Sequence, residues 1–257
     1  MNREQSFFSK TRKQGVLSIP GESFSCFAKR VENLAENRRV FYQKEKSNGM
    51  TSMDFYDDKL KIHKTLFLLE SSKNLKIWEA AATWTIEQEK TLLSYIQIKK
   101  HKRVSLDEIL KHELIHEMRQ GFEENVFEEF LAYKTSTSFL RRWFGPIFLS
   151  SKESLFFVVF FYLLLIVFFI TDSDLISLSV YVSVGLLFIR LAVLQYVFCR
   201  CLKKISRIFQ DIDSLAIAVC LTDREIVKVA FNKKASDFFT INYENSPRWQ
   251  QILDTFT

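Results

Sequence analysis

The sequence is poor in proline, glycine, cysteine and histidine, with three, six, four and four of these among 257 residues. This composition excludes collagen-like and low-complexity chains, and 47% hydrophobic residues exclude a wholly disordered one. The cysteines form no C-x-x-C pair and lack zinc-ribbon spacing, so we interpret them as reduced, structural thiols (Cys26, Cys199, Cys201 and Cys220). The first residues are polar and charged, and we expect no secretory signal peptide.

The excess of positive charge is modest. Lys and Arg number 36 against 30 Asp and Glu, which gives a net charge of +6. No dense basic run with interleaved aromatic residues is present, so we do not expect nucleic acid as a partner. Much of the excess flanks two apolar segments, where membrane topology explains it.

These two apolar segments are candidate membrane spans. Leu155–Ile170 has 16 residues without a charge, six of them Phe. It would rise about 24 Å as a helix, slightly less than a bilayer core, so Ser154 and Thr171 must contribute. The second segment, Leu175–Cys199, is interrupted only by Arg190. The link between the segments is so short that we expect a helical hairpin.

The charges around this hairpin predict its orientation. Lys and Arg precede the first segment and follow the second, whereas the link 171–174 has two Asp and no Lys or Arg. The positive-inside rule then puts both ends of the chain in the cytoplasm. We therefore expect a lipid bilayer as a partner and, without a eukaryotic targeting motif, the bacterial inner membrane. The alternative, a buried helical hairpin in a soluble protein, explains the charge asymmetry poorly.

Arg190 is the one charge within the second segment. Because it lies toward the cytoplasmic side, we expect its long side chain to reach the membrane interface. The alternative is a pair with an internal carboxylate.

Strand and helix signals surround the remaining motif. Residues 91–99 alternate as a β-strand does, and residues 83–86 are a possible partner strand. Ser105 and Glu108 form a capping box that predicts a helix from Leu106 to about Gln120, ended by Gly121. A second helix over about 122–138 would complete an αα-hairpin. Another capping box, at 222–225, predicts a helix to about residue 239.

Two of the four histidines belong to an H-E-x-x-H motif, His112-Glu113-Leu114-Ile115-His116. On a helix, positions i and i+4 share one face, so both imidazoles can reach one ion. Glu113 projects beside them, where it could act as the general base on a zinc-activated water. The alternative is a pair of histidines on a charged helix face without a metal.

A catalytic zinc site needs a third protein ligand and an open position. No histidine follows His116, so the ligand must be a carboxylate, and the next helix offers four (Glu123, Glu124, Glu128 and Glu129). Residues 123 and 124 lie too close to the turn to reach the level of His116. Helical phase does not separate Glu128 from Glu129, because both flank the apolar face equally.

The motif resembles that of gluzincin zinc peptidases, which pair H-E-x-x-H with a Glu on a following helix, often as E-x-x-A. Glu129-Phe-Leu-Ala132 has this form. The motif also looks like that of membrane-embedded gluzincins, including CAAX-processing and penicillin-sensor peptidases. The resemblance covers residues 105–133, about a ninth of the chain, and the short interval between motifs is similar to a minimal gluzincin. It implies His112, His116 and Glu129 as zinc ligands, with Glu128 in reserve, and Glu113 as the catalytic base.

The resemblance also implies an edge strand before the zinc helix that binds an extended peptide, and residues 92–98 would fill that role. An ordinary sheet strand is the alternative. Candidates for stabilising the transition state are Tyr133 and His101, with Arg119 and Tyr95 as further possibilities.

The sequence thus predicts an α+β, zincin-like domain of antiparallel strands, an H-E-x-x-H helix and a ligand helix. We expect a basic, partly disordered region at 1–53, this domain at 54–150, a transmembrane hairpin at 151–200 and a helical cytoplasmic region at 201–257. The predicted function is zinc-dependent hydrolysis of a peptide or protein substrate at the cytoplasmic membrane face. The alternative is a non-catalytic membrane protein with a structural zinc site used for binding.

Overall fold

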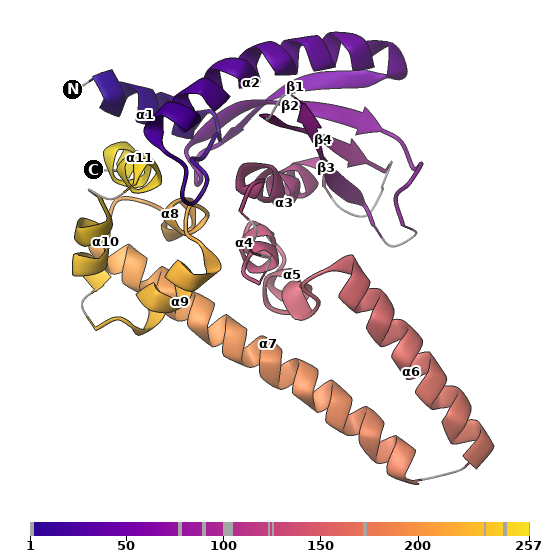
Figure 1. Ribbon diagram of the computed structural model, residues 1–257. Coiled ribbons are helices and arrows are strands. Elements are labelled where there is room, and N and C mark those ends of the chain that lie inside the picture. The colour runs from indigo at the N-terminus through magenta and orange to yellow at the C-terminus, as the bar shows by residue number, and fades with distance from the viewer. Residues whose placement is uncertain are drawn as a thin grey trace.

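The computed structural model describes residues 3–76, 79–88, 91–99, 105–122, 124, 126–171, 174–233, 235–243 and 246–256. Within these residues the chain is α+β, with one four-stranded sheet and eleven α-helices (Figure 1). The elements are α1 Arg3–Lys13, α2 Phe24–Glu45, β1 Met50–Asp57, β2 Ile62–Glu70, β3 Ala81–Gln88, β4 Thr91–Ile98, α3 Leu106–Arg119, α4 Glu128–Lys134, α5 Phe139–Phe144, α6 Ser151–Thr171, α7 Asp174–Ile208, α8 Ser214–Ala218, α9 Asp223–Phe231, α10 Ala235–Tyr243 and α11 Pro247–Phe256. Short 3-10 helices lie at Lys46–Asn48 and Gly145–Ile147.

The sheet has the strand order β1-β2-β4-β3. The predicted pairing of residues 83–86 with 91–99 is confirmed, because β3 and β4 are antiparallel neighbours. The sheet is mixed rather than wholly antiparallel, since β2 and β4 pair in parallel from Leu68↔Ile96 to Glu70↔Ile98. The prediction that residues 92–98 form an edge strand was wrong: β4 is hydrogen-bonded on both sides, and β3 is the edge next to it.

Helices cover both faces of the sheet, with α2 on one face and α3 on the other (Figure 1). Successive strand residues point to opposite faces. Phe67 of β2 therefore packs with Leu34 and Phe41 of α2. Its neighbour Leu66 belongs to the main core together with residues of α3, including Leu110 and Leu114. This packing holds α3 against the sheet beside its edge strand.

The N-terminal region differs from the partial disorder predicted for residues 1–53. It forms α1 and α2, and the buried side chains of α2 are Phe27, Leu34, Asn37 and Phe41. Phe8 of α1 stacks on Phe27, with ring centroids 6.2 Å apart. The buried positions of α2 are widely spaced on a long, highly charged helix, and this narrow apolar stripe explains the weak sequence signal.

The predicted helix at Leu106 is confirmed as α3, and the Ser105 side chain accepts a hydrogen bond from the Glu108 amide. Gly121 follows it with a φ of +92°, where a Cβ would lie 2.8 Å from Ile19 Cδ1. The next helix is shorter than predicted: α4 begins at Glu128 and ends at Lys134. The Asp223 carboxylate, distant in sequence, accepts hydrogen bonds from the two amides just before α4.

Three buried arginines bind the carbonyl groups at the end of α8. Arg12 donates to Ala216 O at 2.8 Å, Arg119 to Leu221 O at 2.6 Å, and Arg248 to Cys220 O at 2.7 Å. The last carbonyls of a helix lack partners within it, and guanidinium groups supply several donors each. The arginines thereby join α1, α3 and α11 around α8.

The main core crosses the predicted domain boundaries. It contains residues from the N-terminal region, α3, α7 and the C-terminal helices, among them Leu17, Leu114, Ile205, Leu221 and Ile252. The C-terminal region is helical as predicted, and both halves of the capping box at Thr222 and Glu225 form. Its first long helix ends at Phe231 rather than near residue 239, and α10 follows.

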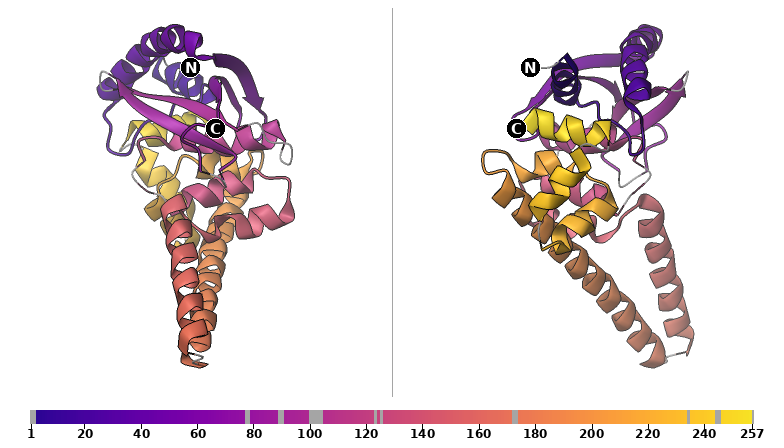
Figure 2. Two further views of the ribbon diagram at one scale, coloured as in Figure 1. Left: turned by 90° about the vertical axis from the view of Figure 1, so that its right-hand side faces the viewer. Right: turned by 60° about the vertical axis from the view of Figure 1, so that its left-hand side comes forward.

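Helices α6 and α7 form a hairpin that projects from the rest of the molecule (Figure 2). Both are long and apolar enough to cross a membrane. In the most apolar stretch of α6 no residue is buried, and in that of α7 only 28% of the residues are buried. A buried hairpin in a soluble protein would pack these side chains into the core, whereas here they form a large exposed apolar surface.

Arg190 of α7 pairs with Glu153 of α6 and donates to Ile147 O at 2.6 Å. The structure therefore shows the internal carboxylate partner that was the alternative to a side chain reaching the interface. The pair links the two helices at the end of the hairpin nearer the sheet.

Candidate metal centre

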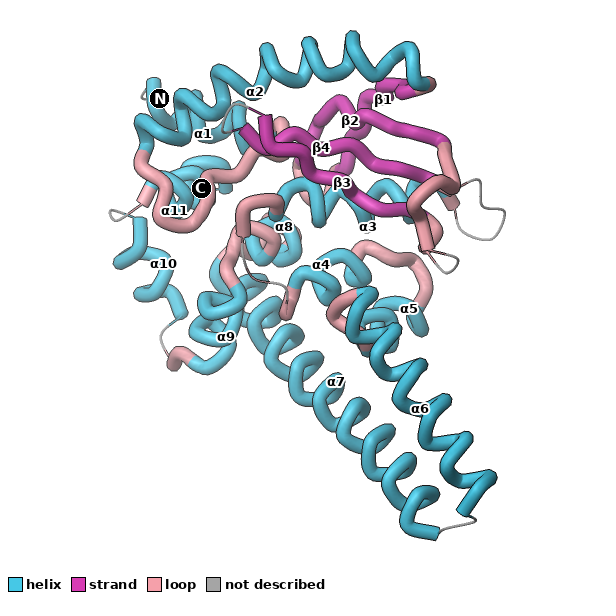
Figure 3. Tube along the Cα trace, turned by 45° about the vertical axis from the view of Figure 1, so that its right-hand side comes forward, coloured by secondary structure: helices cyan, strands magenta, loops and turns pink. Residues whose placement is uncertain are grey.

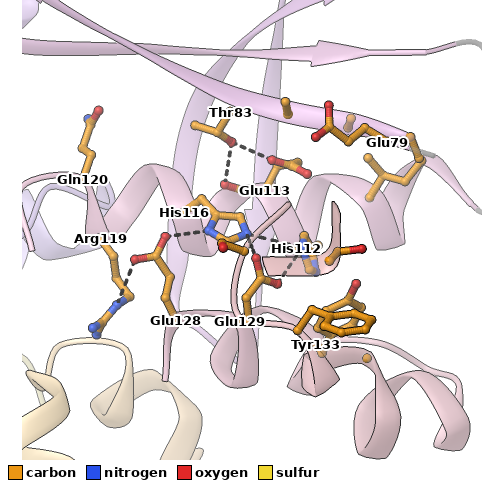
Figure 4. Close-up of a pocket in the computed structure, with 18 of the residues that line it drawn as sticks. Glu79, Thr83, His112, Glu113, His116, Arg119, Gln120, Glu128, Glu129 and Tyr133 are labelled. Carbon is orange, nitrogen blue, oxygen red and sulfur yellow. Dashed lines mark hydrogen bonds and ion pairs between the residues drawn. The ribbon is translucent and has the colours of Figure 1, made fainter. Parts of the chain in front are cut away.

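His112, His116 and Glu129 converge on one point between α3 and α4 (Figure 4). The Nε2 atoms of the histidines lie 3.3 Å apart, and each lies 3.8 Å from an oxygen of Glu129. Donors bound to a tetrahedral zinc ion at 2.0–2.1 Å would be about 3.3 Å from one another. The three side chains therefore have close to the separation that one such ion requires.

Glu128 has a different position from Glu129, although helical phase did not separate them. Its Oε1 accepts a hydrogen bond from His116 Nδ1 at 2.6 Å. This bond leaves Nε2 of the ring free to bind an ion and fixes its orientation. Glu128 also lies 3.8 Å from Arg119, whose guanidinium is fixed by the carbonyl groups after α8.

Glu113 lies beside the two histidines, between α3 and β3. Thr83 Oγ1 is 2.9 Å from Glu113 Oε2, to which it donates, and 3.1 Å from the backbone carbonyl of the same residue. Thr83 thus aims one carboxylate oxygen and anchors α3 to the edge strand. The sequence predicts a strand at Thr83 but no role for its side chain, because the contact with Glu113 depends on the register of β3.

The charges of the site suit a divalent cation. Burial lowers the pKa of His112 to about 3. Burial also opposes the charged form of His116, but its hydrogen bond to Glu128 and the nearby carboxylates raise its pKa to about 9. Burial raises the pKa of Glu113 and of Glu129. Two imidazoles and three carboxylates thus lie together, and a divalent cation bound among them would favour the charged form of the carboxylates.

The site opens into a cleft of about 600 Å³. One wall is β3, with Ala81, Ala82 and Thr83, and the opposite wall includes Tyr133. The cleft extends to Ser154 at the start of α6. It therefore joins the His–Glu cluster to the free edge of the sheet and to the beginning of the hairpin.

Of the other predicted site residues, some line the cleft and others lie away from it or outside the described residues. Tyr133 lines the cleft, and its ring meets that of His112 edge-on at 4.7 Å between centroids. Arg119 also lines the cleft, but its buried guanidinium binds backbone carbonyl groups. Tyr95 packs on the far side of the sheet against Phe41. His101 and Glu123 lie outside the described residues.

Comparisons with protein-family models, with curated proteins and with solved structures gave no match for this chain. The cluster, the cleft and the hairpin themselves are therefore the features that bear on its function.

Proposed function

We propose that the protein is a zinc metallopeptidase, anchored by the α6–α7 hairpin, that hydrolyses peptide bonds at the cytoplasmic face of a membrane. The observation that carries this proposal is the convergence of His112, His116 and Glu129 on one point, with Glu113 beside it. Within the residues described, this is a donor set of two imidazoles and one carboxylate, as in zinc peptidases of the gluzincin type.

Each member of the cluster has a role in this chemistry. His112, His116 and Glu129 would hold the ion, with Glu128 orienting His116. Zinc bound there supplies a Lewis acid and lowers the pKa of water. Glu113 accepts a proton from the attacking water and delivers it to the leaving amine, with its carboxylate held by Thr83.

The free edge of β3 is the proposed binding site for an extended peptide. Ala81, Ala82 and Thr83 line the cleft beside Glu113, and their small side chains leave space for a substrate backbone. A peptide that added to this edge would form main-chain hydrogen bonds with β3 while its scissile carbonyl faced the cluster. We therefore propose that β3, and not residues 92–98, is the edge strand that binds the peptide in a zincin-like arrangement. Tyr133 is the proposed donor to the developing oxyanion.

A catalytic site is favoured over a structural zinc site used for binding. Structural zinc is almost always enclosed by four protein ligands, whereas catalytic zinc has three and an open position. Here three donors gather at the wall of an open cleft, with a buried carboxylate next to them.

The location at a membrane rests on the exposed hairpin and the charges that flank it. Basic residues at the ends nearer the sheet, against two Asp in the link, favour a cytoplasmic position for both termini. The bacterial inner membrane is the membrane that we propose.

The metal site is tested by zinc analysis of the full-length protein in detergent. After zinc loading and dialysis, the unchanged protein is expected to retain one ion per chain, and Glu129→Gln is expected to lose it, because only two ligands remain. Glu36→Gln, an exposed change on α2, is the matched control. An unchanged protein that holds no metal under zinc-replete conditions would contradict the proposal.

Glu128→Gln is expected to lower zinc affinity by about 10- to 100-fold, because the imidazole of His116 loses a charged hydrogen-bond partner. Competition with a chromophoric chelator measures this affinity. Since the three ligands remain, zinc binds more weakly but is not lost. An affinity equal to that of Glu36→Gln would show that Glu128 has no part in the site.

A further inference from the structure

The outer surface of α7 carries two hollows that the proposed peptidase site does not use. The first is an apolar groove of about 590 Å³ between α5 and α7. Its wall includes Phe139, Trp143 and Phe144 of α5 and Leu191, Ala192 and Tyr196 of α7. Its buried polar residue, Gln195, uses its side-chain amide to donate to the carbonyl groups of Arg142 and Trp143. The groove thus presents almost entirely hydrocarbon and aromatic surface.

The second hollow, of about 410 Å³, is basic and continues the first. Both are lined by Tyr196 and Cys199. The remaining wall consists of four cations on one face of α7, at the spacing of successive helical turns (Arg200, Lys203, Lys204 and Arg207). An apolar trough and a cationic pocket therefore lie end to end along a single helix.

These cations differ in the hydrogen bonds that they form with the rest of the protein. Arg200 donates to Ala230 O and to the Tyr196 hydroxyl, at 2.7 and 2.6 Å. Lys204 donates to Asn232 O. Lys203 and Arg207 are exposed, and within the described parts of the chain neither forms an ion pair or a side-chain hydrogen bond. At least two cations can thus bind an external anion without losing a protein partner.

The dimensions and polarity of this surface correspond to one membrane leaflet. From Phe188, at the apolar end, to Lys203 the helix rises about 22 Å, which is half the thickness of a bilayer with its headgroups. The groove lies on the part of α7 nearer the tip of the hairpin, and the basic hollow lies on its C-terminal part, which packs against α8 and α9. Figure 3 shows this course of α7. Phe139, Trp143 and Phe144 are exposed at the groove, as aromatic residues at a membrane interface are.

We propose that this surface binds one anionic phospholipid, with an acyl chain in the groove between α5 and α7 and its phosphate on the basic hollow. This inference rests on the proposed membrane location of the hairpin, but not on hydrolysis or on zinc. A zwitterionic phospholipid would bring its own ammonium group next to the cations of the hollow, and a soluble phosphate would leave the groove empty. Both charge and hydrocarbon are therefore required of the ligand.

Native mass spectrometry of the full-length protein in detergent tests this site. The unchanged protein, offered phosphatidylglycerol and phosphatidylcholine of the same chain length, is expected to retain the former in preference. Each juxtamembrane cation contributes about a fivefold change in binding to anionic lipid. Lys203→Gln is therefore expected to weaken phosphatidylglycerol binding about fivefold, and K203Q/R207Q about thirtyfold.

Two further variants separate this site from general electrostatic attraction. K29Q/R39Q removes the same charges from exposed positions on α2 and is expected to leave lipid retention unchanged. Ala192→Phe fills the groove and is expected to weaken retention without changing any charge. Glycerol phosphate, which has no chains, is expected not to bind detectably.

The proposal is overturned if the unchanged protein shows no preference for phosphatidylglycerol, or if K29Q/R39Q loses as much lipid as K203Q/R207Q. Equal binding of glycerol phosphate would likewise replace the lipid site by a simple anion site. The outcome is independent of the peptidase proposal. A zinc-free protein that prefers phosphatidylglycerol would overturn only the metal site, and a zinc-loaded, active protein without this preference would overturn only the lipid site.

Discussion

Replacing Glu113 by glutamine is expected to lower kcat for peptide hydrolysis by about 10²- to 10⁴-fold while leaving bound zinc unchanged. The carboxylate is buried beside the histidines but is not one of the three converging donors. A glutamine of the same shape keeps its contact with Thr83 but cannot accept a proton from water. The result would separate proton transfer from metal binding.

The measurement combines zinc analysis with digestion of a peptide library by the detergent-solubilised protein. Asp107→Asn, an exposed change on the same helix, is the matched control and is expected to retain full activity. Loss of zinc from the Glu113 variant would assign that residue a structural role. Activity equal to that of the control would remove Glu113 from the mechanism.

Glu117→Gln is expected to lower the free energy of unfolding by about 3–5 kcal/mol, because it leaves a buried lysine without its counter-charge. Glu117 is next to His116 in sequence but faces the sheet. Its carboxylate lies 3.0 Å from Lys64 Nζ and accepts from Ser94 at 2.6 Å. The side chains of Glu117 and Lys64 are only 2% and 6% exposed. Burial disfavours the charge of Glu117, but Lys64 and Arg38 lower its pKa, so the carboxylate is ionised in the folded protein.

Denaturant unfolding followed by circular dichroism measures this effect. Asp58→Asn breaks an exposed pair with Lys61, whose atoms are 2.8 Å apart, and is expected to leave the unfolding midpoint unchanged. Both substitutions remove the carboxylate partner of a lysine, so the difference between their effects on stability measures the effect of burial on the ion pair. A Glu117 variant as stable as the Asp58 variant would mean that water reaches Lys64 and solvates it.

The features that the sequence predicted well depend on neighbouring residues. Ser105 caps the start of α3 and Gly121 follows its end, because the serine oxygen satisfies a free amide and glycine accepts a positive φ. The i, i+4 spacing brings His112 and His116 together through helical geometry alone. Long uncharged segments likewise form long helices, since α6 and α7 include both predicted apolar runs.

Other features depend on residues that are far apart in sequence. The position of β4 inside the sheet follows from its parallel pairing with β2, a long-range contact with no local signal. The early start predicted for α4 failed because Asp223, about a hundred residues away, binds the amides before Glu128. Order in the N-terminal region arises from packing of Phe27 and Phe41 onto surfaces that exist only in the folded chain.

The candidate site likewise has features that depend on neighbouring residues and features that depend on the packing of distant ones. The sequence by itself determined the two histidines, the neighbouring Glu113 and the need for a downstream carboxylate, because these follow from helix periodicity and ligand chemistry. The E-x-x-A resemblance favoured Glu129 over Glu128, but only the tertiary structure shows that Glu129 faces both imidazoles and that Glu128 binds the back of His116. It also brought Thr83 to Glu113 and made β3 the free edge of the sheet. The two glutamates flank the apolar face of α4 about 100° apart, and the rotation of α4 against α3 decides which one meets the histidines.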